Sequence, residues 1–173
     1  MKIRNGFVTN SSSSSFIVSF DKGSDIRNKL EKQLKQIGYD CFLDRLYTDV
    51  VNGATSVEKC RHELADYFFL DGIKKVEKKY GVEYAYECIE NIDATTGEPC
   101  FKHKDVWRGA EESEYDRLNA EAWAYSFELA HKIIPLDGSK EYSIVYYEDH
   151  NSSELEHEIM PYLECTVYRM SHH

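Results

Sequence analysis

The strongest constraint on the fold lies near the start of the chain, where five serines, Ser11–Ser15, lead directly into an alternating segment. The apolar residues Phe16, Val18 and Phe20 recur at every second position. This two-residue period is typical of a β-strand with one strongly apolar face. Such a strand needs other strands beside it and a layer of side chains over it. The rest of the chain therefore has to supply both.

Two further β-rich segments lie close to the C-terminus, at residues 142–147 and 165–170. Between them, Ser153 and Glu156 have the spacing of a capping box that would open a short helix, and Pro161 would close it. A connection that carries a helix is long enough for a crossover between parallel strands. We therefore expect the N-terminal strand to join a C-terminal strand–helix–strand unit in one sheet.

The long middle of the chain has mainly helical periodicity. Apolar residues recur at spacings of three and four in residues 26–37, 57–68 and 115–133, which predicts helices there. A less regular helical spacing occurs in residues 39–51 and 82–89. We expect residues 93–100 to form a loop. We predict an α+β fold in a single domain of residues 1–173. In this fold a small sheet of about three strands, formed by the N-terminal strand and the C-terminal strand–helix–strand, is covered by the mostly helical middle.

The charge and cysteine content narrow the choice of partners and location. The formal net charge is −10, and such a surface repels phosphate backbones, so we expect no direct binding of nucleic acid. The apolar runs are far shorter than the roughly 20 residues that a membrane helix needs, so we expect no membrane association. Five widely spaced cysteines without a CxxC motif indicate reduced thiols and hence a cytoplasmic protein.

Histidines and aspartates gather near the ends of the two C-terminal strands. If these strands run parallel, their carboxyl ends lie at the same edge of the sheet, where open sheets bind ligands. Imidazole and carboxylate groups are ligands for zinc and similar ions. We therefore predict a divalent-metal site there, with zinc as the possible cofactor; the alternative is that these groups are solvated or pair as salt bridges. The predicted ligands are Asp149, His150, His157, His172 and His173.

The serine tract has three interpretations. Serine side chains bond to nearby backbone and favour turns, so the tract is expected to form an ordered turn that enters the first strand. The alternatives are a loop that wraps an anion with its backbone N–H groups, or an extended edge strand. The sequence contains no GxGxxG, GxxxxGK[ST], GxSxG or HExxH motif that would assign an enzyme class.

An acidic run at residues 111–116 is the candidate for partner binding. Glu111, Glu112 and Glu114 would offer negative charge to a protein with a basic surface. The same run is also compatible with the acidic first turn of the long helix, which the helix dipole favours. We take these three residues as the predicted binding residues.

The opening NGFVTNSSSSSF resembles the N-terminus of many small uncharacterised proteins of bacteria and their phages, and the ending EHEIMPYLECTVYRMSHH is similar to that of some of them. The resemblance covers about the first and last twenty residues, and it implies a bacterial or mobile-element origin but no activity. Because a binding role needs no catalytic constellation and the sequence has no secure one, we favour a protein-binding factor over an enzyme. Such a factor would suit inhibition of a host system that acts on nucleic acid, in the manner of anti-CRISPR proteins. The alternative is a metal-dependent hydrolase at the histidine cluster.

Overall fold

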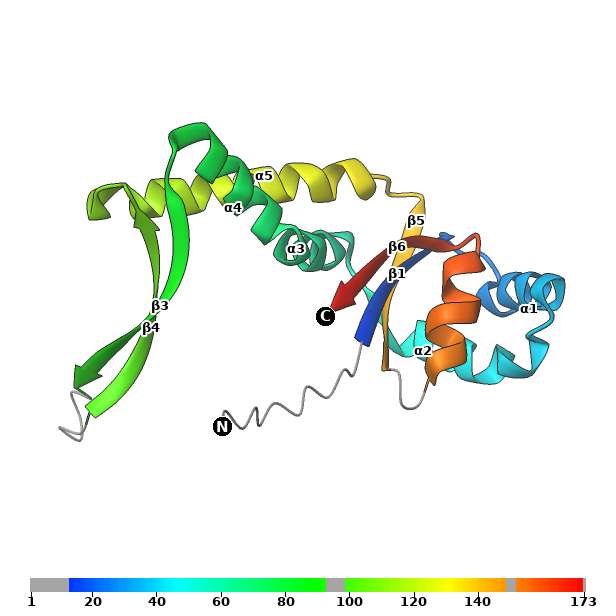
Figure 1. Ribbon diagram of the computed structural model, residues 1–173. Coiled ribbons are helices and arrows are strands. Elements are labelled where there is room, and N and C mark those ends of the chain that lie inside the picture. Colours follow the sequence, from blue (N-terminus) through cyan, green and yellow to red (C-terminus); the bar gives the residue numbers. More distant parts are fainter. Residues whose placement is uncertain (1–12, 93–98, 149–151, 173) are drawn as a thin grey trace, which may run out of the picture. The chain divides into compact units, whose positions relative to one another are not determined.

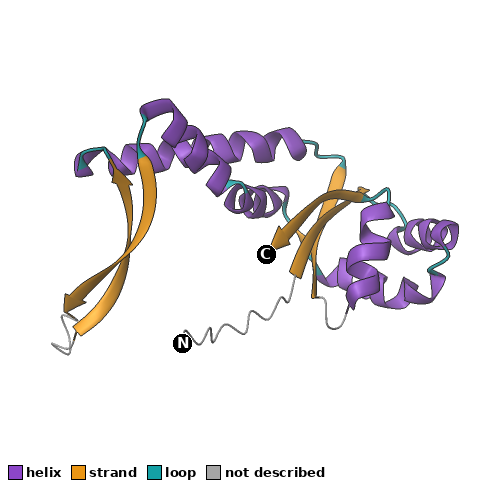
Figure 2. Ribbon diagram, viewed as in Figure 1, coloured by secondary structure: helices purple, strands orange, loops and turns teal. Residues whose placement is uncertain are grey.

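A computed structural model describes residues 13–92, 99–148 and 152–172 of the chain (Figures 1 and 2). The chain divides into two compact units. The first, here called the sheet unit, comprises residues 1–63 and 131–173; the second, called the hairpin unit, comprises residues 64–130. This division does not decide how many domains fold independently, so the single domain of residues 1–173 stays a prediction.

The sheet unit contains a four-stranded sheet in which the N-terminal strand is one of the two inner strands. The order is β2 (Ala54–Thr55), β5 (Lys140–Glu148), β1 (Ser13–Asp21) and β6 (Thr166–His172). Both β5 and β6 pair antiparallel with β1, so they run in the same direction on either side of it. The predicted α+β class and the union of the first strand with the C-terminal strands are confirmed, with the two-residue β2 as an addition.

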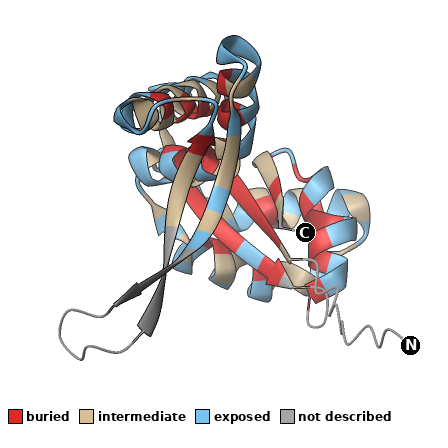
Figure 3. Cartoon of the chain, turned by 60° about the vertical axis from the view of Figure 1, so that its left-hand side comes forward, coloured by how far each residue is buried: buried red, intermediate tan, exposed pale blue. Residues whose placement is uncertain are grey.

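Helical segments cover one face of this sheet and close its core. Phe16, Val18 and Phe20 of β1 pack in one cluster with apolar side chains such as Leu30 and Leu155, and Figure 3 shows the resulting band of buried residues along the strands. Ile17 on the opposite face of β1 is buried as well. These helical segments are α1 (Ile26–Ile37), η1 (Asp40–Phe42), α2 (Leu43–Asn52), the π-helical turn η3 (Glu154–Ile159) and η4 (Met160–Tyr162).

The hairpin unit is built from helices and one antiparallel β-hairpin. Its small core contains Ile73, Val76, Trp107, Leu118 and Ala122. The Trp107 indole N–H donates to the Asn119 side chain at 2.8 Å. The elements are α4 (Phe69–Tyr80), β3 (Glu83–Ile92), β4 (Pro99–Arg108), η2 (Glu112–Glu114) and α5 (Tyr115–Ile133); the unit boundaries fall within α5 and within α3 (Val57–Tyr67).

The structure corrects two predictions for the middle of the chain. Residues 82–89 were expected to be helical, but residues 83–92 form β3, and Pro99 and Cys100 of the expected loop belong to β4; residues 93–98 lie outside the described part. The apolar residues of so short a segment fit both periods, and the pairing with β4 decides between them. Aromatic side chains such as Tyr84 and Tyr86 also favour a strand.

None of the described helices is both long enough and apolar enough to cross a bilayer.

Candidate functional site

The serine end of β1 lies between the ends of both C-terminal strands. Ser13 is in register with Glu148 of β5 on one side and with His172 of β6 on the other. The carboxyl ends of β5 and β6 therefore share one edge of the sheet, here called the serine edge, as the parallel crossover requires. Because β1 runs the opposite way, Asp21 lies at the other end of the sheet, in register with Lys140.

The structure places only part of the predicted metal cluster. Asp149, His150 and His173 lie outside the described residues, and His172 is placed only as the last residue of β6. His157 lies in η3. Within the described residues, no three His, Cys, Asp or Glu side chains come close enough together to hold a metal ion. The zinc site and the enzyme that would use it stay predictions.

A buried carboxylate occupies the described part of the serine edge. Glu156 is fully buried, and its Oε1 accepts a hydrogen bond of 2.6 Å from the Ser14 hydroxyl. The Arg169 guanidinium of β6 lies 3.2 Å from the same oxygen and donates through Nε to Ser14 Oγ at 3.1 Å. The guanidinium carbon of Arg169 also lies over the Phe16 ring, 5.6 Å from the ring centre. Three segments distant in sequence are thus joined by one charged network.

This network replaces two sequence-based interpretations. Glu156 was expected to cap the short helix with Ser153, but Ser153 makes no side-chain capping bond and Glu156 points into the protein. Of the serines expected to form an ordered turn before the strand, Ser13–Ser15 are part of β1 itself, and Ser14 and Ser15 are buried. Ser11 and Ser12 lie outside the described residues. A hydroxyl at position 14 is needed because it donates to a carboxylate that water does not reach.

His157 lies beside the same network. Its Nδ1 is 3.4 Å from Arg169 Nη2, and its Nε2 is 3.8 Å from Glu156 Oε2. A guanidinium only donates, so a hydrogen bond from Arg169 to Nδ1 requires the tautomer of His157 that carries its proton on Nε2. The structure therefore places this predicted metal ligand beside Arg169 and Glu156.

The three predicted binding glutamates lie in the hairpin unit, directly before α5. Glu111 precedes η2, Glu112 pairs with Lys104 of β4, and Glu114 pairs with Arg117 at 2.9 Å. Two of the three charges are therefore matched within the chain. The contact of Glu112 with Lys104 also places the acidic run against the β-hairpin.

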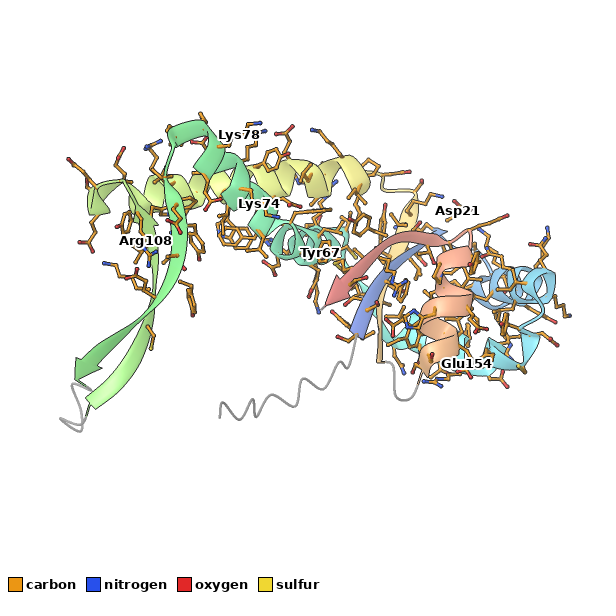
Figure 4. All side chains as sticks on the ribbon, in the orientation of Figure 1. Asp21, Tyr67, Lys74, Lys78, Arg108 and Glu154 are labelled. Atoms are coloured by element: carbon orange, nitrogen blue, oxygen red, sulfur yellow. The ribbon has the colours of Figure 1, made fainter. Side chains whose placement is uncertain are left out.

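The hairpin itself presents an open surface. Among the described residues no third strand pairs with β3 or β4, and Figure 1 shows the hairpin extending away from α4 and α5 of its unit. Tyr86 in the middle of β3 is 65% exposed, and Cys88 is exposed too. At the base of the hairpin, Arg108 bonds to Glu87 across the strands at 2.8 Å (Figure 4 labels Arg108).

Sequence reasoning missed the two central groups of these sites. Glu156 could not be recognised because its spacing from Ser153 also fits a capping box. Tyr86 was assigned to a helix, although its two-residue spacing from Tyr84 is a strand signal that was available.

Comparison with models of protein families, with curated proteins and with solved structures finds no match to this chain.

Proposed function

We propose that this chain is a cytoplasmic protein-binding factor of bacterial or mobile-element origin that engages a basic surface of a host protein. The binding surface would be the hairpin surface, defined here as β3, β4 and the acidic residues Glu111, Glu112 and Glu114. The observation that carries the proposal is the exposed Tyr86 on a two-stranded ribbon without neighbouring strands in the described part of the chain.

The hairpin surface suits a protein partner for two physical reasons. Unpaired strand edges offer backbone N–H and C=O groups to an incoming strand, which is a common mode of recognition. Tyrosine supplies a large contact area and a polar tip with little loss of conformational freedom, and it is enriched where binding energy concentrates.

The charge of this surface favours a basic partner. Glu111 makes no ion pair with a described residue, whereas Lys104 and Arg117 are already matched by Glu112 and Glu114. With the net charge of −10, a partner with clustered lysines and arginines would associate faster and with dependence on salt. Occupation of a basic nucleic-acid channel, as in inhibition of a host CRISPR system, is the specific form that we propose.

The test compares two tyrosines of similar exposure. Tyr86 is 65% exposed in the hairpin and Tyr162 is 68% exposed in η4 of the sheet unit. We expect Tyr86→Ser to abolish capture of a defined partner from host lysate, because it removes the central anchor. Tyr162→Ser should capture the same partner as the unchanged protein. Equal capture by both variants would refute the hairpin surface as the binding site.

Charge reversal tests the electrostatic part separately. Glu111→Lys leaves the two intramolecular pairs intact, so its effect reports on the partner alone. We expect a slower association rate at low salt and a smaller difference at high salt, measured by surface plasmon resonance. An association rate that does not change with salt would exclude a basic partner surface.

A further inference from the structure

A pocket of about 400 Å³ opens in the sheet unit at the end of the sheet opposite to the serine edge. One wall is a single face of α1, since Lys29, Lys32, Gln33 and Gln36 recur at spacings of three and four. The ends of the strands form the facing wall, and Asp21, which ends β1, is labelled in Figure 4. We call this feature the lysine pocket.

The residues that line the lysine pocket include more ammonium groups than carboxylates, although the chain is strongly acidic. Lys29 and Lys140 both donate to the Asp21 carboxylate, at 2.7 and 2.6 Å, so two ammonium groups share one counter-charge. Lys32 makes no ion pair with a described residue. The exposed Glu164 also lines the pocket, which leaves three ammonium groups against two carboxylates. An anion in the pocket could therefore pair with Lys32, and also with Lys29 and Lys140, which share the single Asp21 carboxylate.

One wall also carries an unused acceptor. The side-chain oxygen Oε1 of Gln33 is buried and accepts no hydrogen bond from any described residue. Leaving a buried polar atom without a partner is costly, so a ligand donor that turned this side chain toward the pocket would be favoured. A phosphate oxygen cannot donate when ionised, whereas a hydroxyl group can.

We propose that the lysine pocket binds a small phosphate monoester that carries hydroxyl groups. Lys29, Lys32 and Lys140 hold the phosphate, and the Gln33 amide oxygen accepts from a hydroxyl of the same molecule. The volume is within the range of small-molecule sites and exceeds what inorganic phosphate alone would fill. This site is separate from the hairpin surface, so either can fail without the other.

The experiment uses calorimetry and backbone amide NMR at constant ionic strength, with inorganic phosphate, glycerol 3-phosphate and glycerol as probes. The variants are Lys32→Ala and Gln33→Leu. The control is Lys78→Ala, which removes an exposed lysine of α4 in the hairpin unit that makes no ion pair with a described residue (Figure 4 labels Lys78). Thermal unfolding of each variant confirms that the fold is retained.

We expect glycerol 3-phosphate to bind the unchanged protein more tightly than inorganic phosphate does. Its binding should change the chemical shifts of backbone amides in α1 and β1. Lys32→Ala should lower the affinity for both phosphate probes about tenfold, because one charge-assisted hydrogen bond is lost. Gln33→Leu should lower the affinity for glycerol 3-phosphate severalfold and leave the affinity for inorganic phosphate unchanged. Absence of saturable binding, or equal affinities of Lys32→Ala and Lys78→Ala, would overturn the proposal.

Discussion

Glu156 sets the strictest local requirement in the sheet unit, because a carboxylate removed from water needs hydrogen bonds and an opposite charge in place of solvent. Ser14 and Arg169 provide these at Oε1, whereas the buried Oε2 accepts no hydrogen bond from a described residue. Neither partner could be predicted from the neighbourhood of Glu156 in the sequence, since they lie 142 and 13 positions away. A spacing pattern identifies a local cap, but a buried network depends on which strands become neighbours.

Removal of the Glu156 carboxylate should be strongly destabilising. Glu156→Ala leaves the Arg169 guanidinium and the Ser14 hydroxyl without their acceptor, and we expect a loss of about 2–4 kcal/mol in the free energy of unfolding. Glu154→Ala, an exposed position in the same helical turn (Figure 4 labels Glu154), should change it by less than about 0.5 kcal/mol. Urea denaturation measures both, and similar midpoints for the two variants would contradict the buried network.

Asp21, at the other end of the sheet, makes the stability of the fold depend on pH. Hydrogen bonds from Lys140 and Lys29 lower the pKa of this carboxyl from 3.8 to about 2. Because the folded pKa is the lower one, the pairing stabilises the fold above about pH 3.8, and this contribution is lost as the pH falls toward 2. NMR titration of the Asp21 carboxyl carbon should give the low value, rising when Lys140 is replaced by Ala. An unchanged titration in Lys140→Ala would count against the pairing.

At the scale of elements, segments with a long and regular period are predictable from sequence. The period of residues 115–133 matches α5, and the alternation at residues 16–20 lies within β1. The hairpin was missed because Lys102 and Lys104 interrupt the apolar alternation of β4, so its identity depends on pairing with β3. The proposed binding surface was therefore only partly visible in the sequence, through the spacing of Tyr84 and Tyr86 in β3 and the acidic run beside the hairpin.

The packing of α4 on α5 gives a test at this scale. A Cβ added to Gly72 would lie 2.2 Å from the Ala122 carbonyl oxygen, so Gly72→Ala should force the helices of the hairpin unit apart. We expect a loss of about 1–3 kcal/mol in the free energy of unfolding, despite the better helix propensity of alanine. Gly138→Ala, where nothing lies within 4 Å, is the control. Equal stability of the two variants would contradict the close contact.

At the scale of the whole molecule, the inner strand β1 comes from the N-terminal part of the chain, and both of its neighbours, β5 and β6, come from the C-terminal part. Ser13 is in register with Glu148 and His172, so the sheet cannot close until nearly all of the chain is available, and such non-local pairing is slow. Sequence patterns predicted this union of the two ends. They could not predict which surface would remain open for a partner, because exposure results from the packing of all other segments.

Hydrogen–deuterium exchange of the complex with the captured host protein tests the proposed binding role most directly. We expect amides of residues 83–88 and 104–108 to become protected on binding, because the partner would cover the hairpin and pair with strand edges that no other described strand covers. Amides of α1 and β6 in the sheet unit should exchange as they do in the free protein. Protection confined to the sheet unit, with unchanged exchange in the hairpin, would contradict the account.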